Sequence, residues 1–141
     1  MADDSGLMVN ILNGEPGVRS ARFAKPNLKS KQDEANNQKL LDLMSNIKDL
    51  KKRKAVFVSV IVFVRTPTDP LPIITHGYWQ GIIHFEPKGT NGFGYDPIFY
   101  CPYFKKTTAE MLKEEKMQIS HRAKAIKKMN LVLREQCDES I

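Results

Sequence analysis

The stretch AVFVSVIVFV, residues 55–64, is the longest apolar run in the sequence, and the expected fold is built around it. It is dense in β-branched residues, which favour strands, and apolar and polar residues barely alternate in it. A run of this kind is typical of a strand buried on both faces of its sheet. It is also far shorter than the roughly 18–20 apolar residues that cross a bilayer.

Other elements are expected around this run. GYWQGIIHFE, residues 77–86, predicts a second long strand antiparallel to the first, and shorter strands are expected at 7–12 and 98–100. Apolar residues at helical spacing predict an amphipathic helix over residues 34–50. The polar residues 25–33 before it are expected to form a mobile surface loop. We therefore expect a single α/β domain over residues 1–141, built on a mixed sheet.

The C-terminal part predicts two helices. Thr107-x-x-Glu110 is a capping box that indicates a short helix. Ser120 is the expected N-cap of a second helix. The residues expected to face the core from this last helix are Ile126, Met129 and Leu133.

Composition narrows the class of protein without deciding its function. The hydrophobic content of 41% and charged content of 27% are ordinary for a soluble globular protein. The acidic N-terminus lacks the apolar region of a signal peptide, so a cytoplasmic location without a membrane partner is expected. A net charge of +6 fits binding to nucleic acid, and it fits a phosphate-rich small ligand equally well.

Three segments carry residues suited to chemistry, and the first is Asp3-Asp4-Ser5. Adjacent carboxylates can bind a metal or orient water, although a plain solvated terminus explains them too. Alternation along a strand would point Asp3 and Asp4 to opposite sides, so only one of them would face a cleft.

The second segment is the loop 89–97, whose glycines flank Phe93. Glycine lets the backbone approach a ligand closely. An accessible ring beside the Asp96 carboxylate suits a purine that stacks on one and hydrogen-bonds to the other. A tight turn with a core phenylalanine is the alternative.

The third segment places Lys116 in a connection between two helices and His121-Arg122 in the first turn of the second helix. A helix N-terminus favours anions. These donors suit a phosphate or a carbonyl oxygen such as purine O6. A solvated basic loop would explain the same residues.

Taken together, the motifs ADDSGL, GFGYDPIF and SHRAKA resemble the inosine triphosphate pyrophosphatase family, in order and over nearly the whole chain. The resemblance implies hydrolysis of ITP, dITP and XTP to the monophosphate and pyrophosphate with Mg²⁺. It also implies an elongated mixed sheet flanked by helices, a cleft between two lobes, and a homodimer. Nucleic acid is not an expected partner.

The resemblance also implies roles for individual residues. Asp4 becomes the proton acceptor and a metal contact, Asp3 its metal- or water-orienting neighbour, and Ser5 a substrate contact. The implied substrate contacts at the base end are Phe93, Gly94, Tyr95, Asp96, Lys116, His121 and Arg122.

One departure from the family pattern affects these expectations. In the family, a strand with a Ser/Thr-x-Asn-x-x-Lys phosphate loop and a helix with a metal-binding glutamate precede ADDSGL, which here begins at Ala2. We therefore expect an N-terminally truncated member with open sheet edges. The alternatives are an inactive remnant that still binds purine nucleotides and a small basic nucleic-acid-binding protein.

Overall fold

The computed structural model describes residues 1–25 and 31–139. One sheet has the strand order β2-β1-β3-β4-β5-β6, and every strand pair in it is antiparallel. The strands are β1 (Ala2–Val9), β2 (Pro16–Gly17), β3 (Lys54–Phe63), β4 (Ile73–Ile83), β5 (Phe99–Cys101) and β6 (Lys106–Thr107). The helices are α1 (Gln32–Leu43), α2 (Lys113–Ile119) and α3 (His121–Glu139).

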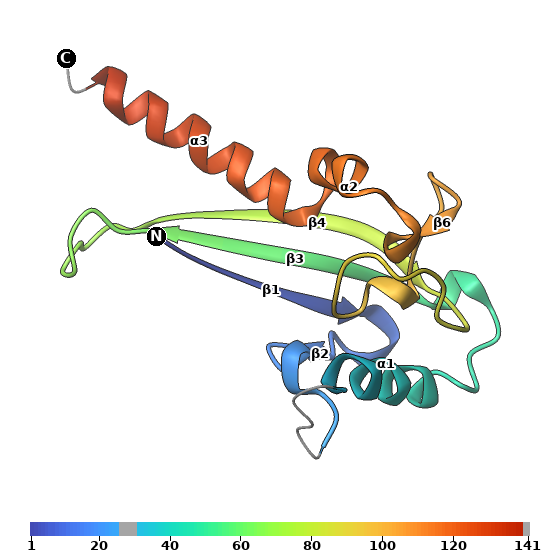
Figure 1. Ribbon diagram of the computed structural model, residues 1–141. Coiled ribbons are helices and arrows are strands. Elements are labelled where there is room, and N and C mark those ends of the chain that lie inside the picture. Colours follow the sequence, from blue (N-terminus) through green and yellow to red (C-terminus); the bar gives the residue numbers. More distant parts are fainter. Residues whose placement is uncertain (26–30, 140–141) are drawn as a thin grey trace.

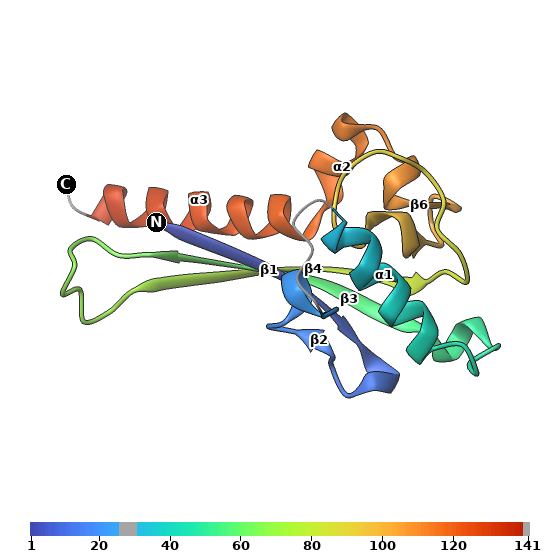
Figure 2. The same ribbon diagram turned by 60° about the horizontal axis from the view of Figure 1, so that its bottom comes forward.

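Two groups of elements flank the long strands. Helix α3 lies along β4, and α1 lies with β2 at the other end of the sheet (Figure 1). The turned view shows the β3–β4 hairpin, α3 and the start of β1 on one side of the molecule, with β2, α1, α2 and β6 on the other (Figure 2). The expected α/β class, with an elongated sheet flanked by helices, is confirmed. The expectation of a mixed sheet is wrong, because every described strand pair is antiparallel.

The two long strands pair as expected, but β3 is not buried on both faces. Its partner residues run from Lys54 opposite Ile82 to Phe63 opposite Ile73. Burial alternates along β3, with Phe57 and Ile61 buried and the valines between them only partly buried. One face is covered because Ile61 packs against Ala125 and Met129 of α3. No second layer covers the opposite face among the described residues.

The start of α3 lies directly on β4 at a glycine. A Cβ added to Gly77 would stand 1.7 Å from the backbone oxygen of His121. Only glycine permits this approach, which places the first turn of α3 against the middle of the sheet. The position of His121 is therefore fixed by β4.

Several expected element boundaries change. Helix α1 begins at Gln32, inside the expected loop, and ends at Leu43 instead of residue 50. Residues 26–30 of that loop lie outside the described part of the chain. β1 begins at Ala2, so both aspartates belong to the strand instead of preceding it.

The C-terminal helices also differ in detail. The Thr107–Glu110 capping box is present, but it opens a short 3₁₀ turn over Thr108–Glu110. Lys116 then lies within α2 and not in the connection after it. Ser120 caps α3 as expected, since its hydroxyl accepts a hydrogen bond from the Ala123 N–H at 3.1 Å. Ile126 is 43% exposed and does not face the core, because the face of α3 that lies on the sheet carries Ala125 and Met129.

Within residues 1–25 and 31–139, no helix combines the length and the apolar character that a membrane span requires.

Candidate active site

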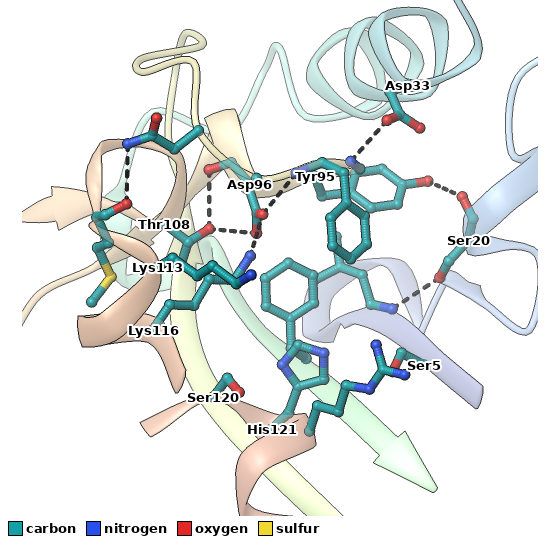
Figure 3. Close-up of a pocket in the computed structure, with 18 of the residues that line it drawn as sticks. Ser5, Ser20, Asp33, Tyr95, Asp96, Thr108, Lys113, Lys116, Ser120 and His121 are labelled. Atoms are coloured by element: carbon teal, nitrogen blue, oxygen red, sulfur yellow. Dashed lines mark hydrogen bonds and ion pairs between the residues drawn. The ribbon is translucent and has the colours of Figure 1, made fainter. Parts of the chain in front are cut away.

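A cleft of about 800 Å³ lies between two walls. β1 and α1 contribute one wall, α2 and the start of α3 contribute the other, and the loop 91–96 borders both (Figure 3). The cleft brings together residues of all three segments singled out from the sequence. The predicted site residues that line it are Ser5, Phe93, Gly94, Tyr95, Asp96, Lys116, His121 and Arg122.

The loop presents an exposed ring above a buried carboxylate. Phe93 is 74% exposed, whereas Asp96 is 3% exposed. The Asp96 carboxylate accepts hydrogen bonds from the Phe93 N–H at 3.0 Å and the Thr108 hydroxyl at 2.8 Å, and it also pairs with Lys116. Asp96 therefore shapes the loop, and the free base-binding carboxylate expected beside the ring is occupied by protein donors.

Aromatic surfaces face the cleft from two sides. The ammonium of Lys116 lies 5.2 Å from the centre of the Phe93 ring, within the range of a cation–π contact. The His121 ring stacks on Phe57, with ring centres 4.8 Å apart and planes at 20°. A flat aromatic ligand would find stacking partners at both places, with cationic groups at its edge.

Tyr95 holds the loop in place instead of offering a free hydroxyl. Its hydroxyl donates to the Ser20 carbonyl at 2.7 Å. Burial, reinforced by the charge of Asp33, raises the pKa of Tyr95 well above its usual value. The phenol therefore stays protonated and acts as an anchor.

The two N-terminal aspartates occupy different places. Asp3 pairs with Arg122, which lines the cleft. The Asp4 carboxylate accepts a hydrogen bond from the Ser5 N–H at 2.9 Å and is exposed. Neither aspartate is among the residues that line the cleft, so Asp3 approaches it only through Arg122. Alternation along β1 accounts for the difference, since Asp3 and Ser5 share one face and Asp4 lies on the other.

The described residues contain no group of three or more histidine, cysteine or acidic side chains close enough to hold a metal. Mg²⁺ is commonly held by only one or two carboxylates together with substrate phosphates. Asp3 lies on the cleft face of β1 beside Arg122 and can supply one such carboxylate to a magnesium ion that arrives with a nucleotide. Asp4 lies on the opposite face of the strand and does not pair with Asp3 around a common ion in this arrangement.

Several cleft residues were missed by sequence reasoning. Phe57 lies within the apolar run, where nothing distinguishes a cleft residue from a core residue. Asp33 and Asn36 come from α1, and Thr108 from the turn before α2. Asp33 was assigned to a loop, and its position one helical turn before Asn37 signals a shared face only once α1 is known to begin at Gln32.

The burial of His121 leads us to expect that folding stability depends on pH. Burial, followed by the charge of Lys116, lowers the pKa of His121 from 6.5 to about 4. Between these pH values the unfolded chain binds a proton that the folded chain does not, so the free energy of unfolding falls as the pH falls. We expect a loss of about 2 kcal/mol by pH 4, allowing for solvent screening.

Urea unfolding at several pH values checks this effect. Carboxylates also titrate at low pH, so the difference between the wild type and His121→Gln isolates the histidine. The stability of the variant should fall less between pH 7 and pH 4.5. Identical slopes for both proteins would show that His121 does not titrate in this window.

The fold and the site define the class of this molecule as an α/β protein whose antiparallel sheet carries a cleft lined by aromatic rings and cationic side chains. Comparison with known families then places the molecule: the Ham1 family model matches residues 1–131, and the chain belongs to that family.

The relatives support this assignment in sequence and in structure. The dITP/XTP pyrophosphatase of Escherichia coli K12 is 49% identical over 127 residues, which cover 90% of this chain and 62% of the relative. The Yersinia pestis dITP/XTP pyrophosphatase is 47% identical, with 96% and 66% covered. A Ham1 protein structure from Coxiella burnetii superposes with a TM-score of 0.86 at 46% identity, covering 95% of this chain and 66% of that one. The chain thus spans just under two thirds of the length of these relatives.

Proposed function

We propose that this chain binds purine nucleoside triphosphates with a 6-oxo base, such as ITP, dITP and XTP, and hydrolyses them to the monophosphate and pyrophosphate. The observation that carries the proposal is the cleft, where Phe93, Lys116 and His121 converge. The names of its relatives, dITP/XTP pyrophosphatases, support the same substrate class.

Selection of the base follows from the hydrogen-bond donors of Lys116, His121 and Arg122 in the cleft. The lowered pKa of His121 leaves its ring neutral at pH 7, with one N–H to donate. Lys116 and Arg122 are donors only. A 6-oxo purine offers an acceptor to this set, whereas the amino group of adenine would leave donors unpaired. An unpaired buried donor costs about 1–3 kcal/mol, so ITP should bind about 10- to 100-fold tighter than ATP.

In the proposed hydrolysis, each carboxylate of β1 has a separate role. Asp4 would accept a proton from the water that attacks the α-phosphorus, and the bond to the leaving pyrophosphate would break. Asp3 would orient that water, and Ser5 would contact the substrate. Asp3, on the cleft face of β1, would hold Mg²⁺, which offsets charge on the phosphoryl oxygens when it is bound. By resemblance to the family, Asp4 is proposed as a second metal contact. By resemblance to the family, the active form is proposed to be a homodimer.

A second candidate function is nucleotide binding without hydrolysis. Asp4 lies outside the cleft lining, and the described residues lack a three-ligand acidic cluster. Both observations concern the residues proposed to act on the phosphates. They do not affect the residues proposed to bind the base. This candidate predicts the same preference for ITP over ATP and no pyrophosphate release.

Intrinsic tryptophan fluorescence can report nucleotide binding in this protein. Trp79 is the only tryptophan in the chain, and its ring centre lies 6.5 Å from that of His121. Titration with ITP and with ATP should change its fluorescence, and pyrophosphate release is followed in parallel with Mg²⁺ present. We expect the tighter binding of ITP, and a loss of about tenfold in ITP affinity for Phe93→Ala through lost base stacking.

Tyr103→Ala is the matched control, because Tyr103 is 87% exposed and does not line the cleft. Equal affinity for ITP and ATP would contradict the proposed selection of the base. Salt-sensitive binding of a long polyanion that Phe93→Ala leaves unchanged would favour a nucleic-acid-binding protein instead.

A further inference from the structure

Helix α1 holds both backbone polar groups of one residue in the cleft loop. The Gly94 N–H donates to the Asp33 carboxylate at 2.9 Å. The Gly94 carbonyl accepts a hydrogen bond from the Asn37 side-chain amide at 3.1 Å. Asp33 and Asn37 are one helical turn apart, so they lie on a single face of α1. We call their two hydrogen bonds to Gly94 the Asp33–Asn37 bracket. Figure 3 shows Asp33 reaching the loop from the helix above it.

The bracket acts on a residue with an unusual backbone conformation. Gly94 has φ +60°, in the left-handed region that favours glycine. A glycine without neighbours would visit many conformations, and its choice sets the direction of the chain on either side. Because Phe93 immediately precedes it, the orientation of the Phe93 ring depends on how Gly94 is held.

The two residues that follow Gly94 are tied to opposite walls of the cleft. Tyr95 is anchored to Ser20, on the same side as α1. Asp96 is tied to Thr108 and Lys116, on the side of α2. The loop therefore bridges the two walls, and α1 supplies the contacts at the residue next to the exposed ring.

We infer that Asp33 and Asn37 are positioning residues that orient Phe93 for stacking on the base of the bound nucleotide. Neither residue contacts the base in this role. They act by fixing the two peptide groups of Gly94, which sets the direction of the preceding ring. The inference rests on the proposed function for its ligand, but the bracket itself is a property of the free protein.

The test compares variants of α1 by their affinity for ITP, measured through Trp79 fluorescence. Asp33→Ala removes the acceptor for the Gly94 N–H, and Asn37→Leu removes the donor to its carbonyl. Each variant should weaken ITP binding about 3- to 10-fold, the usual effect of one lost hydrogen bond. Asp33→Asn keeps a side-chain oxygen that can accept from Gly94, so it should restore most of the affinity.

Two further comparisons separate positioning from general stability. Glu34→Ala removes the other acid of the same helical turn and should leave the affinity for ITP unchanged. In a Phe93→Ala background, Asp33→Ala should cause no further loss, since the ring that it orients is gone. A purely structural role would lower the melting temperature and leave the affinity intact, or would weaken binding equally in both backgrounds. Either result would overturn the inference.

Amide hydrogen exchange tests the bracket without any nucleotide. The Gly94 amide should exchange at least several-fold faster in Asp33→Ala than in Glu34→Ala. Unchanged exchange would refute the bracket even if nucleotides bind. Faster exchange in a protein that binds no ITP would uphold the bracket, refute the assigned role in base stacking, and count against the proposed function.

Discussion

Asp4→Asn is expected to lower the rate of pyrophosphate release from ITP by about 10²- to 10⁴-fold, the usual contribution of a general base. Asparagine keeps the shape of the side chain but cannot accept a proton. The Asp4 side chain is exposed and bonds only to the neighbouring Ser5 N–H among the described contacts. The substitution should therefore leave folding almost unchanged. Initial rates at saturating ITP and Mg²⁺ measure the effect, and Trp79 fluorescence verifies that ITP still binds.

Asp3→Asn distinguishes the two carboxylates. Asp3 pairs with Arg122 on the cleft side of β1, so its loss should weaken substrate and metal binding more than it slows the chemical step. Glu15→Gln removes an exposed acid outside the cleft lining and controls for net charge. If Asp3→Asn abolishes release while Asp4→Asn is as fast as the wild type, the proton acceptor is Asp3 and the assignment of Asp4 is wrong.

Arg53→Met is expected to destabilise the fold by about 3–5 kcal/mol, a large part of the 5–15 kcal/mol that a domain of this size commonly has. Arg53 is 2% exposed and lies among the core residues. Its guanidinium donates to the carbonyls of Met44, Ile47, Ile83 and His84. Methionine fills similar space but removes all four hydrogen bonds. The Met44 carbonyl would keep the bond from the Ile47 N–H, while the other three carbonyls would lose their bond to Arg53, and each buried group left unpaired is costly.

The position of Arg53 explains why this loss should affect the whole molecule. Two of the four carbonyls come from the turn that follows α1, and two come from the last residue of β4 and the residue after it. One side chain therefore joins the two segments. Urea unfolding measures the change, and Arg134→Met, at an exposed position of α3, is the matched control. A loss below about 1 kcal/mol for Arg53→Met would show that water or a local shift satisfies the carbonyls instead.

Sequence patterns predicted the elements with strong local signals. The β-branched run became β3, its antiparallel partner became β4, and Ser120 capped the last helix. These features depend on residues close together in the chain. The expected end of α1 at residue 50 was wrong because leucine and isoleucine spacing continues past Leu43, while the backbone turns to meet the Arg53 side chain. That interaction has no local signature.

The candidate site also has features that were visible in the sequence and others that arise only from tertiary contacts. The motifs around Phe93 and His121 were visible as glycine, aromatic and basic residues in short segments. The bracket of Asp33 and Asn37 on Gly94 joins residues about sixty positions apart, and no local pattern encodes it. The burial of Asp96 against Thr108 is likewise a tertiary contact. It turns an expected base-binding carboxylate into one that holds the loop.

The family, the paired long strands and the residue types available in the candidate site could all be predicted from the sequence. Local propensity and short motifs suffice for these. The three-dimensional structure was needed to see that Asp3 pairs with Arg122 of the cleft while Asp4 does not, and that Phe57 and α1 contribute to the cleft walls. These features were not predictable because a side chain acquires its surroundings from strand pairing and helix packing. Those surroundings set its burial, its hydrogen-bond partners and its pKa.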